Sequence, residues 1–264
     1  MDEERYFEGI ESYRLLAKHE VGQNFLIDRD AAKGIVSLLD IKEGDRVLEI
    51  GSGAGSLTYF LSLTSGKVEA IDIDEGLIAK LQNDFGNAVD VHYGNAAKWD
   101  YAPYDKIVGN LPYYITSLII ERALLLGQNA KTMAFMVQKE AAERLLAPMG
   151  TKDYGPLPIL ISLVCDAKRA FNVRRASFAP APHVDSSVLL FTMRERDDKL
   201  ISKTYKLCNS LFLQRRKTIY NNLKNYLHDG DKAREILASL GLAESLRPEA
   251  ISPEQFLALA NFIE

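Results

Sequence analysis

The stretch Arg46-Val-Leu-Glu49-Ile-Gly51-Ser-Gly53-Ala-Gly-Ser-Leu-Thr58 joins a short β-rich run to a glycine-rich turn, and a helical pattern follows. Glycine permits left-handed backbone conformations and lets the chain pass close to a ligand. The spacing is Gly-x-Gly-x-Gly, and Ser56 stands where the dinucleotide-binding pattern has its last glycine. The turn predicts a ligand site without pyrophosphate chemistry, although many strand-to-helix turns share this composition for steric reasons alone.

Short β-rich runs alternate with helical patterns on both sides of this turn, over residues 29–137, which predicts an α/β fold with a doubly wound, mostly parallel sheet. The predicted strands are residues 46–50, 68–73, 89–93, 106–108 and 132–137. The predicted helices are residues 31–39, 57–63, 77–85 and 117–126. Two later apolar runs, residues 159–165 and 187–193, are expected to pair as antiparallel strands at the sheet edge and make the sheet mixed.

After residue 196 the β-rich runs stop, and residues 200–212, 218–226, 233–240 and 253–263 have helical spacing. Ser252, Pro253 and Gln255 form a start signal for the last of these helices. We therefore predict an N-terminal segment, residues 1–28, that contributes to the ligand site, an α/β domain, residues 29–196, and a small C-terminal helical domain, residues 197–264.

The composition is that of a protein with a buried core, since 47% of the 264 residues are hydrophobic and 26% are charged. The first residues lack the basic-then-apolar order of a secretory signal, and no apolar run approaches the ~20 residues that span a bilayer. We expect a cytoplasmic protein with no membrane partner. Cys165 and Cys208 lie apart from any Cys or His cluster, so we expect two buried thiols and no metal site.

Charge is distributed unevenly along the chain. The net charge is −4, yet residues 131–230 hold 17 Lys and Arg against 9 Asp and Glu, while the remaining residues hold 15 against 27. A basic face would suit a polyanionic partner, and a chance clustering of solvated side chains is the alternative.

Acidic and amide residues follow the next two predicted strands. Asp72 lies about 20 residues beyond the glycine turn, where a carboxylate accepts hydrogen bonds from ribose hydroxyls. Asp74 shares its strand face, but Asp72 follows the apolar run directly and is the favoured candidate. Asn95 follows the third strand and is predicted to pair with the amino edge of an adenine, with a turn residue as the alternative.

The fourth strand ends in Asn110-Leu111-Pro112-Tyr113. The lone pair of a purine amino group is delocalised into the ring, so a site that methylates this nitrogen must accept hydrogen bonds from both amino protons. The Asn110 side-chain oxygen and the Leu111 carbonyl are the predicted acceptors. Pro112 stiffens the turn, and the Tyr113 ring offers a stacking face for a base removed from its helix. In isolation the tetrapeptide would be an ordinary turn; its place after the glycine turn and Asp72 favours catalysis.

With these residues the sequence closely resembles the KsgA family of ribosomal RNA adenine dimethyltransferases. The resemblance rests on the following segments: Gly22-Gln-Asn24-Phe-Leu26, Glu49-Ile-Gly51, Asn110-Leu-Pro-Tyr113, Val137-Gln-Lys-Glu140, Ser177-Phe-Ala-Pro180, Val184-Asp-Ser186 and Phe212-Leu-Gln-Arg215-Arg-Lys-Thr218. It departs from the family at Asp72, usually Glu, at Asn95, usually Asp, at His183, often Lys, and in residues 16–21, which are less basic than expected.

The resemblance implies a class I, Rossmann-like methyltransferase domain that uses S-adenosyl-L-methionine, without a metal, to dimethylate adenine N6 in 16S ribosomal RNA during ribosome biogenesis. It implies that a monomer acts on the small ribosomal subunit and its RNA. It places at the cofactor the residues Asn24, Leu26, Glu49, Gly51, Gly53, Asp72, Asn95 and Asn110, and it places Phe178 opposite Tyr113 across the target base.

Three alternatives remain open from the sequence: a methyltransferase for large-subunit (23S) RNA of the macrolide-resistance type, a DNA amino-methyltransferase, and a catalytically weak RNA-binding ribosome-assembly factor. The segment 212–218 favours the small-subunit enzyme. Arg215, Arg216 and Lys217 are expected to open a helix and, with Lys224 and Lys206, to meet RNA phosphates. Lys168, Arg169, Arg174 and Arg175 would extend this face. An ordinary solvated helix face is the alternative for each.

Overall fold

The structure is a computed structural model and describes residues 2–13 and 23–263. Gly22 and the weakly basic residues 16–21 lie outside the described residues. Contacts between residues divide the chain into two units, Met1–Ala142 with Ala167–Met193, and Glu143–Asp166 with Arg194–Glu264. The second unit takes in residues 143–166, which the sequence analysis places in the α/β domain.

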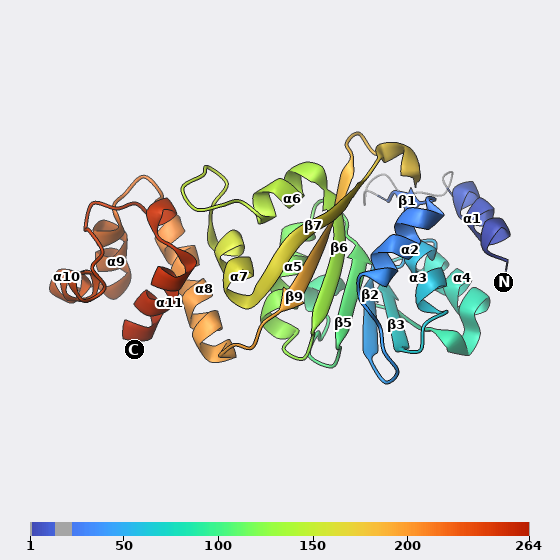
Figure 1. Ribbon diagram of the computed structural model, residues 1–264, viewed down its shortest axis with the longest axis horizontal. Helices are drawn as coiled ribbons and strands as arrows, with labels where there is room; N and C mark the ends of the chain where they lie inside the picture. The colour runs from blue at the N-terminus through green and yellow to red at the C-terminus, as the bar shows by residue number, and fades with distance from the viewer. Residues whose placement is uncertain (1, 14–22, 264) are drawn as a thin grey trace. The chain divides into compact units, whose positions relative to one another are not determined.

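The first unit is built on a mixed sheet with the strand order β4-β3-β2-β5-β6-β9-β7 (Figure 1). Its strands are β2 (Arg46–Ile50), β3 (Lys67–Asp72), β4 (Asp90–Tyr93), β5 (Lys106–Asn110), β6 (Thr132–Gln138), β7 (Cys165–Val173) and β9 (Ser186–Met193). β4, β3, β2, β5 and β6 are parallel, and β9 runs antiparallel to β6. The predicted α/β fold with a mixed, mostly parallel sheet is confirmed.

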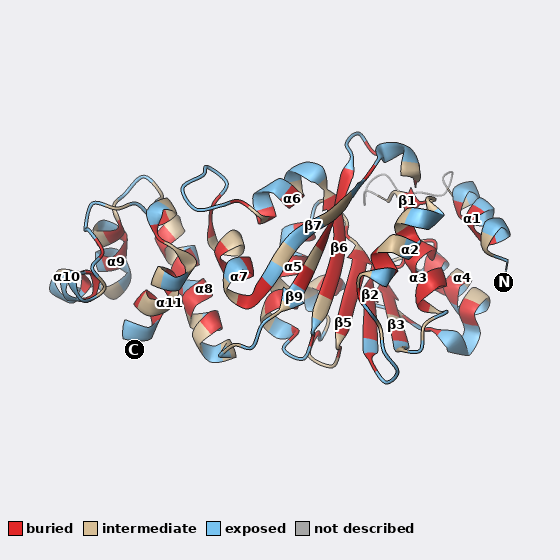
Figure 2. Ribbon diagram, viewed as in Figure 1, coloured by how far each residue is buried: buried red, intermediate tan, exposed pale blue. Residues whose placement is uncertain are grey.

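Helices and short elements complete this unit. They are α1 (Glu3–Ser12), α2 (Arg29–Ser37), α3 (Ser56–Leu61), α4 (Glu75–Phe85), η3 (Gly86–Ala88), η4 (Ala96–Lys98), α5 (Thr116–Leu126), η5 (Arg175–Ser177) and the two-stranded pair β1 (Phe25–Leu26) and β8 (Phe178–Ala179). Several helices begin at a capping carboxylate: Asp28 accepts from the Ala31 N–H and so starts α2. The central strands β2, β5, β6 and β9 and the inward faces of these helices are largely buried, whereas the edge strands β4 and β7 are mostly partly or fully exposed (Figure 2).

The second unit is helical. It contains α7 (Pro156–Val164), α8 (Asp198–Phe212), α9 (Ile219–Leu227), α10 (Gly230–Ser239), η6 (Pro248–Ala250) and α11 (Pro253–Phe262), and α6 (Lys139–Leu145) leads into it. The predicted start of α11 is confirmed, because the Ser252 side chain and Gln255 form a reciprocal capping box. Both Cys165 and Cys208 are buried free thiols, as predicted, and burial raises the pKa of Cys165 to about 12.

One predicted strand is wrong. Residues 159–165 are not a strand, because α7 spans Pro156–Val164 and β7 begins only at Cys165. A continuous apolar run of this length does not distinguish a buried strand from a buried helix by periodicity. Pro156 at the first helical position, after Gly155, was the signal for a helix. No helix of the described residues is long and apolar enough to cross a membrane.

Candidate active site

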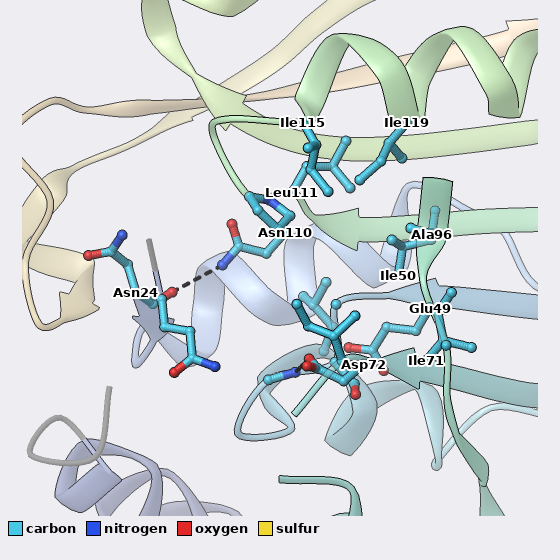
Figure 3. Close-up of a pocket in the computed structure, with 18 of the residues that line it drawn as sticks. Asn24, Glu49, Ile50, Ile71, Asp72, Ala96, Asn110, Leu111, Ile115 and Ile119 are labelled. Atoms are coloured by element: carbon cyan, nitrogen blue, oxygen red, sulfur yellow. Dashed lines mark hydrogen bonds between the residues drawn. The ribbon is translucent and has the colours of Figure 1, made fainter. Parts of the chain in front are cut away.

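A cavity of about 250 Å³ lies where the carboxyl ends of β2, β3 and β5 meet, beside the residues that follow β4 (Figure 3). The strand order reverses between β2 and β5, and open α/β sheets bind their ligands at such a point. The residues of the sequence prediction that line the cavity are Asn24, Leu26, Glu49, Gly51, Gly53, Asp72, Asn95, Asn110, Leu111, Pro112 and Tyr113. The structure thus brings all of these together, and Phe178 is not among the lining residues.

The glycine turn is held to β3 by its backbone. The Gly51 N–H donates to the Ile71 carbonyl at 2.8 Å, and the Gly53 N–H donates to Asp72 Oδ2 at 2.8 Å. Gly53 has a φ of +54°, a conformation that a side chain would strain. The turn therefore exposes backbone to the cavity and ties it to the carboxylate at the end of the next strand.

Asp72 and Asp74, which the sequence left as alternatives, have different surroundings. Asp72 lines the cavity and is 9% exposed, and burial raises its pKa against the opposing backbone N–H donors, of which Gly53 is the strongest. Asp74 caps α4 by accepting from the Gly76 and Leu77 N–H groups, and it also accepts from Gln23 Nε2. Asp74 therefore stabilises a helix start, whereas Asp72 faces the ligand space.

Glu49 is fully enclosed at the end of β2. It is 1% exposed, its Oε2 accepts from Thr58 Oγ1 at 2.6 Å, and burial raises its pKa to about 8, with the Thr58 bond opposing this and the Asp72 charge adding to it. Glu49 is therefore largely protonated at neutral pH in the ligand-free protein.

Asn95 is exposed and begins η4, where its Oδ1 accepts from the Ala97 N–H at 2.9 Å. It serves as the turn residue that the sequence analysis gave as the alternative, and it also lines the cavity. Since Oδ1 already holds one bond, the amide N–H₂ group of Asn95 is the part best able to donate to a ligand.

Asn110 ends β5, and its position depends on a close approach to β2. A Cβ added to Gly109 would lie 2.6 Å from the Ile50 carbonyl oxygen, so glycine is required there. Asn110 Nδ2 donates to the Asn24 backbone carbonyl at 3.2 Å (Figure 3). Only the amide nitrogen donates, so this bond fixes the rotation of the amide and leaves Oδ1 as an acceptor at the cavity.

The loop after Asn110 is held by its own hydrogen bonds. The Leu111 N–H donates to the Met136 carbonyl at 3.0 Å, and Thr116 Oγ1 donates to the Pro112 carbonyl at 2.9 Å. Within the described residues the Leu111 carbonyl accepts no hydrogen bond. The tetrapeptide therefore carries two oxygen acceptors, one from a side chain and one from the backbone, on a fixed loop.

Tyr113 and Phe178 occupy different positions. Tyr113 is half-buried at the cavity, and burial raises its pKa. Phe178 is 3% exposed in β8, which pairs with β1 so that Leu26 lies opposite Phe178. Phe178 thus supports β1, which carries Leu26 and directly follows Asn24, and its predicted role against a base stays a prediction.

The residues predicted to meet RNA fall in both units. Arg215, Arg216, Lys217, Lys224 and Lys206 lie in the second, and Lys168, Arg169, Arg174 and Arg175 lie in the first. Arg215, Arg216 and Lys217 do not open a helix; they form the turn between α8 and α9, because Thr218 caps α9. Arg215 donates to the Lys152 carbonyl at 2.7 Å and lies over the Phe212 ring, so it stabilises the fold of this unit. Arg216, Lys217 and Lys224 are exposed.

Ser52 is a site residue that the sequence analysis missed. It lies between two glycines of the turn, lines the cavity, and its buried Oγ has no hydrogen-bond partner among the described residues. Its position inside the Gly-x-Gly-x-Gly spacing was the available signal.

The chemistry of the lining selects the ligand class. Within the described residues it contains the carboxyl groups of Glu49 and Asp72, amides and backbone, and no Lys, Arg or His. Such a lining offers a phosphate group no cationic side chain, and it suits hydroxyl groups and, through Asp72, a positive charge. Together with the unpaired Ser52 hydroxyl, these residues fit an uncharged or cationic nucleoside. No group of His, Cys, Asp and Glu in the described residues is arranged to hold a metal ion.

Comparison with known proteins points to the same chemistry. The family described as "Ribosomal RNA adenine dimethylase" matches residues 14–264. "Ribosomal RNA small subunit methyltransferase A" of Lactobacillus helveticus is 39% identical over 96% of this chain and 94% of its own, and the protein of that name in Myxococcus xanthus is 34% identical over 95% and 92%. A dimethyladenosine transferase from Plasmodium falciparum is similar in structure, with a TM-score of 0.76, 28% identity and coverage of 89% and 95%. The 23S rRNA methyltransferase ErmE, at 24% identity and a TM-score of 0.67 over 91% and 99%, shares the fold.

Proposed function

The chain belongs to the ribosomal RNA adenine dimethylase family, and on that basis we propose that it dimethylates adenine N6 in small-subunit (16S) ribosomal RNA during ribosome biogenesis. The cofactor is S-adenosyl-L-methionine, which supplies an electrophilic methyl group when it is bound. The observation that carries the proposal is the anchored amide of Asn110, which presents Oδ1 as a fixed acceptor at the cavity.

Asp72, Asn95 and Ser52 account for cofactor recognition in this proposal. Asp72 keeps free lone pairs beside its bonds to the Gly53 and Asp74 N–H groups, and these accept from ribose hydroxyls. Asn95 donates to the adenine edge of the cofactor, and the cofactor supplies the hydrogen-bond partner that Ser52 Oγ lacks among the described residues. The glycine turn brings the backbone close enough for these contacts.

The target amino group is activated by acceptors. Asn110 Oδ1 accepts a hydrogen bond from one amino N–H and the Leu111 carbonyl accepts one from the other. These bonds draw the nitrogen lone pair out of conjugation with the ring and stabilise the positive charge that develops on nitrogen. Pro112 holds the loop rigid, and Tyr113 stacks on the extruded base. The methylated nitrogen is acidic and loses its proton to water, so the chain needs no strong general base.

Methylation of large-subunit RNA is the second candidate, and it has less support. The relatives at 34–39% identity are named for the small subunit, whereas the likeness to the 23S enzyme is one of fold.

In the proposed function the exposed side chains of Arg216, Lys217 and Lys224 meet phosphates of the RNA and position it. The protein acts as a monomer.

Labelled methyl transfer tests the proposal. The protein is incubated with methyl-labelled S-adenosyl-L-methionine and, in parallel, with immature small subunits, large-subunit RNA and DNA. We expect label in the small-subunit RNA alone. Label confined to large-subunit RNA or DNA supports the corresponding alternative, and cofactor binding without transfer to any substrate supports the assembly factor.

A further inference from the structure

The N-terminal helix α1 packs against the back of the cofactor turn, although it lies outside the part of the chain that the family matches. Its buried residues Tyr6, Phe7 and Ile10 belong to the same core cluster as α3 and α4. The Tyr6 ring stacks on Tyr59 with centroids 5.1 Å apart and meets Phe85 edge-on at 5.7 Å. The helix is thus a packed part of the first unit, beside the glycine turn.

Tyr6 and Lys80 both bind the carbonyl oxygen of Ala54, a residue of the turn. Tyr6 Oη donates to it at 3.2 Å and Lys80 Nζ donates to it at 3.0 Å. Lys80 Nζ also donates to Tyr6 Oη at 3.2 Å and to Asp84 Oδ2 at 2.6 Å. These three bonds use every donor of the ammonium group, whose side chain is 14% exposed and lies 4.7 Å from the Tyr6 ring centroid.

Tyr6 and Lys80 contact the Ala54 carbonyl on the side of the glycine turn that faces away from the cavity. Ala54 and Gly53 line the cavity, and Tyr6 and Lys80 do not. The next residue, Gly55, has a φ of +98°, and a Cβ there would collide with the Tyr6 hydroxyl and with Leu81. The turn therefore fits between the cavity and the Tyr6–Lys80 pair only with glycine at this position.

We propose that Tyr6 and Lys80 are positioning residues for S-adenosyl-L-methionine: they hold the Ala54 carbonyl, and so the cofactor-binding face of the turn, from behind. Asp72 fixes the Gly53 N–H from one side and the Tyr6–Lys80 pair fixes the Ala54 carbonyl from the other. A turn with several glycines has many backbone conformations, and ordering it before binding removes an entropic cost from the cofactor. The inference rests on the proposed cofactor.

This arrangement couples the docking of α1 on the first unit to the binding of the cofactor. If docking of α1 favours the binding-competent turn, cofactor binding must favour docking of α1 by the same factor. The N-terminal helix is then part of the cofactor site through Tyr6, without touching the ligand.

Calorimetric titration with S-adenosyl-L-methionine tests the proposal on the full chain. Tyr6→Phe keeps the ring and removes the donor, and we expect the Kd to rise roughly 2- to 10-fold, with a larger rise for Lys80→Met. The double variant should show less than the sum of the two effects, because both donors serve one carbonyl. In turnover assays the cofactor KM rises while kcat stays near that of the wild type.

Tyr154→Phe is the matched control, because its hydroxyl also donates from a buried position to a backbone carbonyl, that of Ile251, at 2.9 Å in the second unit. It should lower the melting temperature and leave the Kd unchanged. Folded Tyr6→Phe and Lys80→Met variants with the wild-type Kd overturn the inference, whereas wild-type protein that does not bind the cofactor overturns the proposed function.

If the variants do not fold, hydrogen exchange on the wild-type protein tests whether cofactor binding stabilises the docked helix α1. Amides of Glu3–Ser12 should exchange more slowly when the cofactor is bound, since binding stabilises the docked helix. An unchanged exchange rate in this helix, with slower exchange in the glycine turn, contradicts the inference.

Discussion

Asn110 Nδ2 donates to the backbone carbonyl of Asn24 at 3.2 Å, across 86 positions of the chain. The bond sets which end of the Asn110 amide meets the substrate, because a carbonyl binds only the N–H₂ end. It also explains why the short strand β1 matters to the site: Asn24 is held there by the pairing of Phe25 and Leu26 with β8. Asn24 thus orients the amide that, in the proposed function, accepts a hydrogen bond from the target amino group.

Replacement of Asn110 separates chemistry from binding. Asn110→Ala should lower turnover by roughly 10²-fold or more, because the side chain acts mainly in the transition state, while the Kd of S-adenosyl-L-methionine stays within a few-fold. Asn110→Asp keeps an acceptor but puts a carboxylate against the Asn24 carbonyl, so it should also lose activity. Single-turnover rates and calorimetry measure the two quantities, and near-normal turnover in the alanine variant would exclude the assigned role.

Substitution of Asp72 should mainly weaken cofactor binding, whereas substitution of Asp74 should mainly lower the free energy of unfolding. Asp72→Ala removes the ribose acceptor and the partner of the Gly53 N–H, so it should weaken cofactor binding by about 1–3 kcal/mol. Asp74→Ala removes a helix cap and should lower the free energy of unfolding by about 1 kcal/mol, with a smaller effect on binding. Equal affinity of Asp72→Ala and wild type in calorimetry would place the ribose contact elsewhere.

Glu49 should make stability fall with rising pH. Its folded pKa of about 8 lies above the ordinary value of 4.5, so between these values the folded protein binds more protons than the unfolded chain. The free energy of unfolding then decreases as pH rises through this window, with a slope of up to about 1.4 kcal/mol per pH unit. Glu49→Gln, which keeps the bond with Thr58, should flatten that slope. Denaturant unfolding of both proteins without cofactor at pH 5, 6, 7 and 8 measures it, and parallel pH profiles for the two proteins would refute a raised pKa at Glu49.

The salt dependence of RNA binding tests the basic residues. Arg216→Gln with Lys217→Gln should weaken binding and reduce the slope of log K against log salt by about 0.7–0.9 for each phosphate that the variant no longer binds. Arg215 is left intact because its bond to the Lys152 carbonyl stabilises the unit. Lys67→Gln with Lys131→Gln, at the opposite ends of the strands from the cavity, is the charge-matched control. If the folded double variant keeps the wild-type slope, Arg216 and Lys217 do not contact phosphates. Lys168, Arg169, Arg174 and Arg175 would then be the candidates for these contacts.

The sequence predicted the sheet and the cavity well because both depend on local signals. Residues 46–50 form a short β-rich run that leads into glycines, and the structure places a strand at Arg46–Ile50. The tetrapeptide at the end of β5 was singled out because it follows the glycine turn and Asp72, and its four residues line the cavity.

Features that depend on tertiary packing were not predictable in this way. The apolar residues of α7 have no period that separates a helix from a strand, and α1 was missed although Asp2 caps it. The Lys80 bonds to Ala54 and Tyr6 join residues 26 and 74 positions apart, and no local pattern marks them. Phe178 is a buried strand residue outside the cavity lining, and its predicted role against a base stays a prediction.

Nucleotide mapping of methylated small-subunit RNA tests the proposed activity most directly. Immature small subunits are treated with wild type or Asn110→Ala protein and S-adenosyl-L-methionine, and the RNA is digested and analysed by mass spectrometry. We expect N6,N6-dimethyladenosine in the 16S RNA with the wild type and its loss with Asn110→Ala, although both proteins bind the cofactor. Unmodified 16S RNA in the presence of wild-type protein that binds the cofactor would contradict the proposed activity.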